Sequence, residues 1–184
     1  MGTYRSGYNL TSKPRQNGDN VTFHEPSTAA SVLAGDTAGI TVDRPRVIVD
    51  VNLLLIREKE ILLGRRKGGF ADGYYSLPAG HLELGEPVVA ALIREAHEEL
   101  GIDIESDDAR FVQVMHNSYG IGRLAFFFEV KKWSGQARNL EPHKCEDIRW
   151  FPLNALPEQM VPHIRDAIGH YIEHGDACLT LYGW

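Results

Sequence analysis

The segment GEPVVAALIREAHEELG, residues 85–101, constrains the fold most, because it has the pattern of an amphipathic helix with two marked ends. Pro87 suits the first helical position, and Gly101 suits the left-handed residue that commonly ends a helix. The apolar positions recur at helical spacing and form one stripe, which comprises Val89, Leu92, Ile93, Ala96 and Leu100. The helix is therefore expected to pack this face against the core of a domain.

The C-terminal half of this helix carries an unusual concentration of carboxylates. Glu95, Glu98 and Glu99 fall within an arc of roughly 100° on a helical wheel, beside the apolar stripe. Like charges at this spacing repel, and negative charge near a helix C-terminus opposes the macrodipole. One interpretation is a solvated acidic face. The other is a set of hard oxygen ligands for Mg²⁺ or Mn²⁺, whose binding would cancel the repulsion.

The rest of the chain alternates between strand-like and helix-like patterns. Strands are expected at 47–56, 61–66, 74–77, 110–118, 123–133 and 146–153, with a last strand or packed terminus at 177–184. The first run is expected to be buried on both faces, and YGIG at 119–122 to join a hairpin. A second helix within 156–175 has a buried side comprising Ile164, Ala167, Ile168, Tyr171 and Ile172. The mixture predicts an α/β (α+β) fold.

Composition and charge limit the function classes and the domain organisation. Residues 1–43 are polar and without a sustained period, so they are expected to form an N-terminal extension, either flexible or an arm over the domain edge or a partner subunit. Residues 44–184 are expected to form the domain. A net charge of −6 argues against binding a nucleic acid polymer. The sequence has no 18-residue apolar run and no apolar signal region, which favours a cytoplasmic protein without a membrane span.

The spacing around the acidic helix is specific. The stretch GHLELGEPVVAALIREAHEELGI, residues 80–102, resembles the Nudix box, the signature of Nudix (MutT-like) hydrolases. Ala96 is smaller than the aliphatic residue that is common at its position. The flanking pattern extends the resemblance over about residues 45 to 175. The matching positions are Gly80, Glu86, Arg94, Glu95, Ala96, Glu98, Glu99, Gly101 and Ile102.

The resemblance implies an α/β/α sandwich around a mixed β-sheet, with the box as a loop–helix–loop, and hydrolysis of a nucleoside diphosphate linked to another group with Mg²⁺ or Mn²⁺. It makes Glu95 a ligand or the general base and has Arg94 orient a glutamate. Glu86 would support the loop or reach metal-bound water. His81, inside the box loop, is a candidate phosphate contact, with a position on a surface loop as the alternative. The metal ligands that it implies are Gly80, through its carbonyl, Glu95, Glu98 and Glu99.

A fourth acid is expected beyond the box, and Glu146 is favoured over Glu141. Lys144 is a candidate phosphate contact. Tyr119 and Phe127 are candidate contacts for a base, with core packing as the alternative for both.

The substrate expected from the resemblance is a nucleoside triphosphate or an oxidised (d)NTP, and a homodimer is a modest expectation. The alternatives are ADP-ribose, a dinucleoside polyphosphate, or a non-catalytic module that binds a nucleotide. The SQPWPF pattern of the NADH-hydrolysing branch is absent.

Overall fold

The apolar run near the start of the domain forms β1 (Ile48–Arg57), a central strand whose residues from Asp50 to Ile56 are all buried. The computed structural model describes residues 46–184, so the expectations for residues 1–43 lie outside the described part of the chain. Glu58, which has a φ of 57°, and Lys59 turn the chain into β2 (Glu60–Arg66), which pairs antiparallel with β1. The burial of β1 confirms the prediction of a strand that is buried on both faces.

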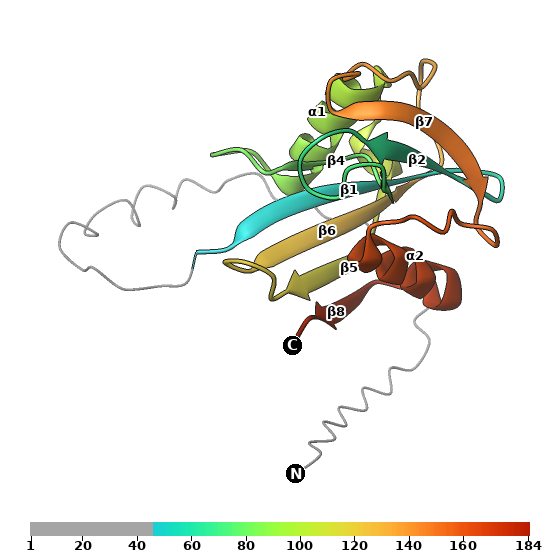
Figure 1. The fold of residues 1–184 in the computed structure, drawn as a ribbon. Coiled ribbons are helices and arrows are strands. Elements are labelled where there is room, and N and C mark those ends of the chain that lie inside the picture. Colours follow the sequence, from blue (N-terminus) through green and yellow to red (C-terminus); the bar gives the residue numbers. More distant parts are fainter. Residues whose placement is uncertain (1–45) are drawn as a thin grey trace, which may run out of the picture.

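The strands form one mixed sheet in the order β3-β2-β1-β6-β5-β8, with β4 added to β1 and β7 added to β2 (Figure 1). The pairs β1–β6 and β5–β8 are parallel, and the other pairs are antiparallel. The expected hairpin is formed by β5 and β6. The remaining strands are β3 (Tyr75–Ser76), β4 (Ala79–His81), β5 (Ala109–Asn117), β6 (Arg123–Val130), β7 (Cys145–Pro152) and β8 (Cys178–Tyr182).

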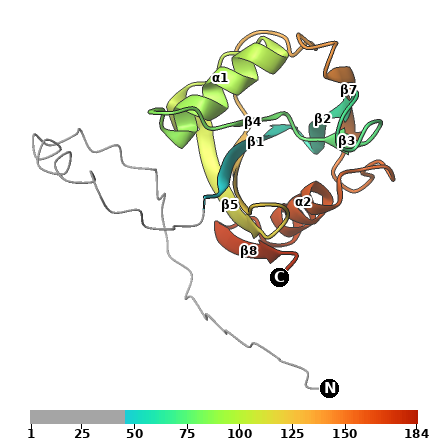
Figure 2. The same ribbon diagram turned by 60° about the vertical axis from the view of Figure 1, so that its left-hand side comes forward.

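Two helices cover opposite faces of the sheet (Figure 2). The first, α1 (Val88–Leu100), packs its apolar stripe on one face of β1 and β6, and the second, α2 (Pro162–His174), packs on the other. The sheet has one hydrophobic core on each face, and alternate residues of β1 pack into the two cores. Leu53 and Leu55 face α1, whereas Leu54 and Ile56 face α2. This arrangement confirms the α/β/α sandwich.

Two details of the helices differ from the sequence predictions. Pro87 precedes α1 with an extended ψ of 150°, and the helix begins at Val88, whereas Gly101 ends it with a φ of 67° as expected. In α2, Ile172 is 48% exposed. The helix packs through Ile164, Ala167 and Ile168, one turn before Ile172, so the predicted stripe extended too far.

Neither α1 nor α2, nor any other helix in the described part of the chain, is long and apolar enough to cross a membrane.

Candidate active site

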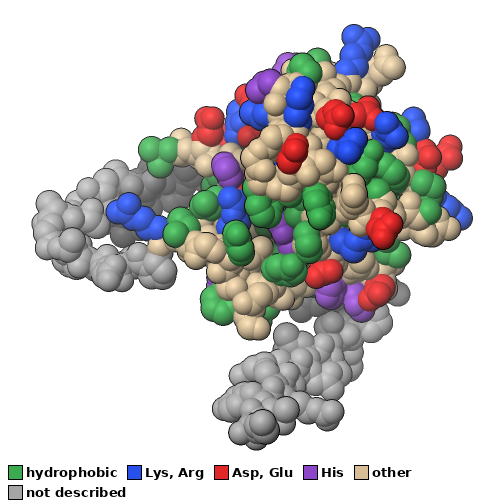
Figure 3. Space-filling view, in the orientation of Figure 1, with side chains coloured by type: hydrophobic (Ala, Val, Ile, Leu, Met, Phe, Trp, Pro, Cys, Tyr) green, Lys and Arg blue, Asp and Glu red, His purple; other side chains and the backbone are tan. Residues whose placement is uncertain are grey.

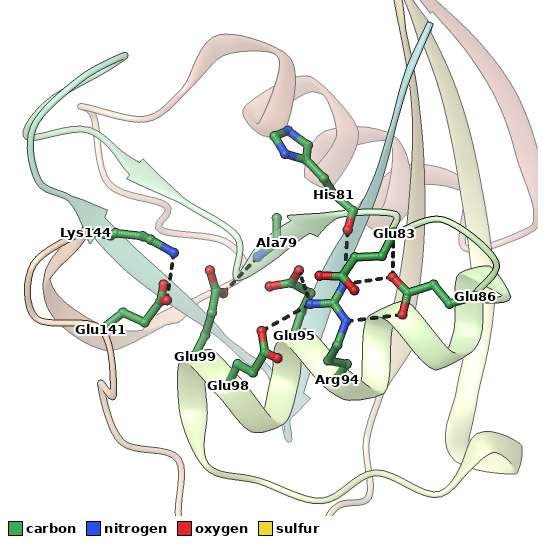
Figure 4. Close-up of polar contacts among 10 residues, drawn as sticks. All are labelled: Ala79, His81, Glu83, Glu86, Arg94, Glu95, Glu98, Glu99, Glu141 and Lys144. Carbon is green, nitrogen blue, oxygen red and sulfur yellow. Dashed lines mark hydrogen bonds and ion pairs between the residues drawn. The ribbon is translucent and has the colours of Figure 1, made fainter.

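Arg94 is the centre of the charge arrangement on α1 (Figure 4). Its guanidinium donates to Glu86 at 2.8 Å and 3.2 Å, to Glu95 at 2.7 Å and to Glu98 at 3.1 Å, and it also donates to the His81 carbonyl. The hydrogen bonds to Glu86 and Glu95 outweigh burial and raise the pKa of Arg94 above its usual value, while Arg94 lowers the pKa of Glu86. The carboxylate repulsion is therefore partly compensated within the protein, which the sequence argument did not foresee.

Glu95 lies directly against the strand that precedes the box helix. A Cβ at Gly80, in β4, would fall 1.8 Å from Cδ of Glu95. No side chain fits there, so the glycine allows the carboxylate to reach the backbone of β4. This contact brings the Gly80 carbonyl and the Glu95 carboxylate into one small region.

Glu99 is the most enclosed acid of the box helix. Its carboxylate accepts the N–H of Ala79 at 3.0 Å. Burial raises the pKa of Glu99 to about 8; the Ala79 bond opposes this, and the neighbouring Glu95 and Glu141 add to it. A carboxyl group with so raised a pKa needs a nearby cation to hold its charge at neutral pH.

The loop after β6 supplies a fourth acid at this place. Its backbone is tied to the end of α1, since the N–H of Leu140 donates to the Glu99 carbonyl at 2.9 Å. The next residue, Glu141, therefore lies beside Glu99 and pairs with Lys144 at 2.7 Å, which raises the pKa of Lys144 (Figure 4).

The preference for Glu146 over Glu141 as the fourth acid is not supported by the geometry. Glu146 lies at the irregular register between β2 and β7, where the pairing skips it, and its side chain pairs with Arg65 at 3.2 Å. It does not line the cavity that contains Glu95, Glu98 and Glu99, whereas Glu141 does. Glu141 takes this position because the backbone hydrogen bond from Leu140 to Glu99 joins residues that are far apart in sequence.

The donor set fits a divalent cation. Gly80, Glu95, Glu98, Glu99 and Glu141 offer carboxylate and carbonyl oxygens, the ligands that Mg²⁺ and Mn²⁺ prefer. In the described residues, however, no three acidic, histidine or cysteine side chains converge closely enough to ligate an ion. Arg94 draws Glu95 and Glu98 toward itself, so those carboxylates have to turn from the guanidinium to bind a metal.

A cavity of about 1040 Å³ extends from these acids across the sheet to the N-terminal end of α2. His81 lines it and pairs with Asp50 at 3.3 Å. At the rim, Phe70 and Tyr119 are 59% and 71% exposed, with ring centroids 6.2 Å apart. Hydrophobic side chains gather in the middle of this face of the molecule, with charged groups around them (Figure 3).

A family model described as the NUDIX domain matches residues 46–171. The chain belongs to the Nudix family. Among solved structures, the MutT NUDIX hydrolase of Burkholderia pseudomallei is 31% identical, with a TM-score of 0.63, over 67% of this chain and 97% of that one. A NUDIX hydrolase of Nitrosomonas europaea is 22% identical, with a TM-score of 0.58, over 77% and 82%, and supports the fold alone.

Curated relatives resemble this Nudix chain over only part of their length. The NAD-capped RNA hydrolase NudC of Stutzerimonas stutzeri is 34% identical over 113 residues, which are 61% of this chain and 39% of that protein. A protein of the same name from Chromobacterium violaceum is 32% identical over 64% and 43%. The chain thus spans about two fifths of the length of these relatives.

Phe127 is not a contact for a substrate in this Nudix fold. Its side chain is fully buried among the residues that pack α2 on the sheet, and it does not line the cavity. The three consecutive phenylalanines of β6 alternate between the two faces, and position 127 faces the α2 core. The other candidates lie at the site. The cavity is lined by His81, Tyr119 and Lys144, and Glu86 of the box bonds to Arg94.

Sequence reasoning missed two polar residues of β1. Asp50 and Asn52 are buried and line the cavity, and Asp50 pairs with Arg123 of β6 at 2.7 Å. The signal was present, because both interrupt an apolar run at positions two apart, which places them on one face of a strand. Two polar residues on one buried face indicate a site rather than a core.

Proposed function

We propose that this chain hydrolyses a phosphoanhydride bond in a nucleoside diphosphate linked to a second group, with Mg²⁺ or Mn²⁺. The observation that carries the proposal is the cluster of Glu95, Glu98, Glu99 and Glu141 at one end of a cavity, where Glu99 is enclosed and accepts the Ala79 N–H at 3.0 Å. Nudix hydrolases generally use such metals. A non-catalytic nucleotide-binding module has no need of all four acids together with Arg94.

Three residues of the cluster, and the groups that position them, have distinct proposed roles. Glu98, Glu99 and the Gly80 carbonyl hold the cation, which supplies charge neutralisation for the phosphates and a lower pKa for water. Glu95, placed by Gly80 and held by Arg94, accepts the proton of the attacking water. Glu86 fixes the guanidinium of Arg94 from the far side, so that the Glu95 carboxylate keeps one direction.

The first substrate that we propose is a nucleoside triphosphate or an oxidised (d)NTP. The supporting observation is the similarity to a protein named as a MutT hydrolase, which this chain covers over 97% of its length. Lys144 and His81 lie where phosphates of such a nucleotide would extend from the carboxylates. Tyr119 offers an aromatic face to whatever part of the substrate reaches the rim.

A dinucleotide is the second candidate. Relatives named NAD-capped RNA hydrolase match this chain at 31–34% identity, although over only 39–44% of their length. Because of this name, an RNA that carries an NAD cap belongs among the substrates to be tested. Such a substrate is a nucleic acid polymer, and the net charge of −6 argues against binding one. The cavity of about 1040 Å³ has room for a second nucleoside.

The deciding experiment is a panel of substrates with the products identified. It comprises normal and oxidised dNTPs, ADP-ribose, NADH, dinucleoside polyphosphates and a short RNA that carries an NAD cap, each with and without Mg²⁺. We expect Mg²⁺-dependent release of a nucleoside monophosphate, with dNTPs preferred. Glu98→Gln is expected to abolish release, whereas Glu146→Gln, in a residue outside the cavity, is not. Unchanged release by Glu98→Gln would contradict the site.

A further inference from the structure

The floor of the cavity contains polar residues that are almost completely buried. Asp50, Asn52, Ser76 and Asn117 all line it. Burying a polar group costs free energy unless it is hydrogen-bonded, so each of these side chains requires a partner. Asp50 pairs with Arg123 and His81, and the side-chain Oδ1 of Asn117 accepts the backbone N–H of Tyr119 at 2.8 Å.

Asn52 is different. Its side chain is 4% exposed, and its Nδ2 donates one long hydrogen bond of 3.4 Å to the Phe126 carbonyl. Its Oδ1 has no hydrogen-bond partner among residues 46–184. Within those residues, every side-chain nitrogen or oxygen that is sealed from solvent has a hydrogen-bond partner. The unpaired Oδ1 of Asn52 is therefore not sealed, and it opens into the cavity that Asn52 lines. One acceptor and one further N–H of Asn52 are therefore available to a ligand.

The register of the sheet places Asn52 between the two ends of the cavity. Asn52 lies opposite Ala79 of β4, whose N–H donates to Glu99 at the acidic end. Two residues earlier, Asp50 is joined to Arg123 at the start of β6, next to the hairpin that carries Tyr119. A group attached to a diphosphate at the carboxylates, and long enough to reach the aromatic rim, passes over Asn52.

Part of the cavity wall is apolar. Leu77, Ala125, Val161 and Ile164 are buried and line the same cavity. A flat nitrogen heterocycle suits such a slot, because its faces are apolar and its edge carries a donor beside an acceptor. A ribose has no flat apolar face to set against these side chains, so its hydroxyls match the polar floor better than this part of the wall. Ser76 adds one hydroxyl, whose donor and acceptor share a single atom, whereas the acceptor and donor of Asn52 lie on two separate atoms.

We propose that Asn52 recognises the base of the nucleotide: its Oδ1 accepts from an N–H on the edge of the base, and its Nδ2 donates to the adjacent ring nitrogen or carbonyl oxygen. This inference rests on the proposed function and makes Asn52 a specificity-determining residue for the same site. The diphosphate is held at the acidic end, and the base is held in the apolar slot above β1.

The test compares ligands that differ only in the base. Binding of AMP, GMP, CMP and UMP is measured by NMR titration of the full chain, with ribose 5-phosphate as the ligand that lacks a base. Asn52→Leu, which has nearly the same shape, is expected to weaken binding of the preferred nucleotide about tenfold. Binding of ribose 5-phosphate is expected to stay within twofold of the unsubstituted protein.

Gln113→Leu is the matched control. Gln113 lies on the same face of the sheet, is 2% exposed and bonds to Thr180 at 2.7 Å, but it does not line the cavity. This variant is expected to melt at a lower temperature without changing either affinity. Asn52→Ser keeps a small polar group and provides a folded variant should Asn52→Leu not fold, with the same expected discrimination.

Equal weakening of nucleotides and ribose 5-phosphate, or no weakening of either, would overturn the inference. The binding assay needs no turnover, so its outcome is separate from that of the proposed function. A base-dependent loss in Asn52→Leu with no hydrolysis of any phosphoanhydride supports the base site and rejects the hydrolase. Hydrolysis with no base-dependent loss does the opposite.

Discussion

The backbone of Gly80 and the carboxylate of Glu95 are in direct contact, so that a Cβ at position 80 would lie 1.8 Å from Cδ of Glu95. Non-bonded heavy atoms cannot approach so closely, and any side chain at position 80 has to displace the glutamate. The glycine fixes where the proposed general base points. Gly80, which has no side chain, thus sets the position of the Glu95 carboxylate.

Gly80→Ala is expected to lower kcat/KM at least about 100-fold, because it moves the Glu95 carboxylate by an ångström or more. Steady-state kinetics on the best nucleotide of the panel, with circular dichroism to check folding, measures the effect. Gly169→Ala is the control, since it lies in α2 with open space around it. That variant is expected to gain about 0.5–1 kcal/mol of stability and keep full activity. Full activity in Gly80→Ala would contradict the role given to the contact.

Arg94→Lys is expected to reduce activity about 10- to 100-fold, because the single nitrogen of an ammonium group cannot replace the three guanidinium nitrogens that bond Glu86, Glu95 and the His81 carbonyl from different directions. The loss should fall mainly on kcat, with apparent Mg²⁺ affinity measured in parallel. Arg149→Lys, at an exposed pair with Asp147, is expected to change neither. Equal effects of the two substitutions would show that Arg94 does no more than stabilise the fold.

Mg²⁺ is expected to raise the melting temperature, because it binds carboxylates that are assembled only in the folded protein. At 100 times its dissociation constant the gain is about 2.7 kcal/mol, or roughly 5–10 °C for a domain of this size. Differential scanning fluorimetry with a chelator as the reference measures it. Glu99→Gln is expected to lose most of the shift. A melting temperature indifferent to millimolar Mg²⁺ would count against the cation site.

Glu141→Gln and Glu146→Gln form a matched pair on one loop and the strand after it. Glu141 lies beside Glu99 in the cavity, whereas Glu146 pairs with Arg65 outside it. We expect the first substitution to lower kcat/KM about tenfold or more and the second to change it less than twofold. The reverse order, measured under saturating Mg²⁺, would restore Glu146 as the fourth acid.

Acid sensitivity is expected to arise at Glu129, far from the box. Burial alone would raise its pKa, but hydrogen bonds from Arg110, Lys131 and Tyr171 outweigh it and lower the pKa to about 2. An unfolded chain has a glutamate pKa of about 4.3, so it binds more protons than the native state between these values. The stabilisation is therefore present above about pH 5 and lost as the pH falls toward 2.

Urea unfolding between pH 2.5 and 6 tests this, with Glu129→Gln for comparison. The difference in unfolding free energy between the two proteins is expected to shrink on acidification. A difference that stays constant across this range would assign the acid sensitivity to other carboxylates.

Local patterns were sufficient for the helices and strands that surround the site. The spacing of apolar residues identified α1 with its C-terminal glycine, and the β-branched run identified β1. Asp50 and Asn52 were missed because a long apolar run was interpreted as a uniform core strand. The choice between core packing and a base contact for Phe127 stayed open in the sequence, because the face that it takes depends on pairing with β1 and β5, which its neighbours in sequence do not determine.

The position of the fourth acid depended on contacts that a sequence pattern does not contain. Glu141 reaches Glu99 because the loop after β6 bonds to the last turn of α1, about 40 residues earlier in the chain. The arm at residues 1–43, the homodimer and the cytoplasmic location stay predictions.

The parallel pairing of β1 with β6 has a consequence for how the protein acquires activity. Ile48 lies beside Arg123 and Leu55 beside Val130, so this central ladder closes over about 75 residues of intervening chain. Such non-local pairing forms slowly, and it alone joins Asp50 and Asn52 to the hairpin that carries Tyr119. A chain in which this ladder has opened lacks an assembled slot for a base even where α1 persists. Loss of nucleotide affinity should therefore precede loss of helical signal during denaturation.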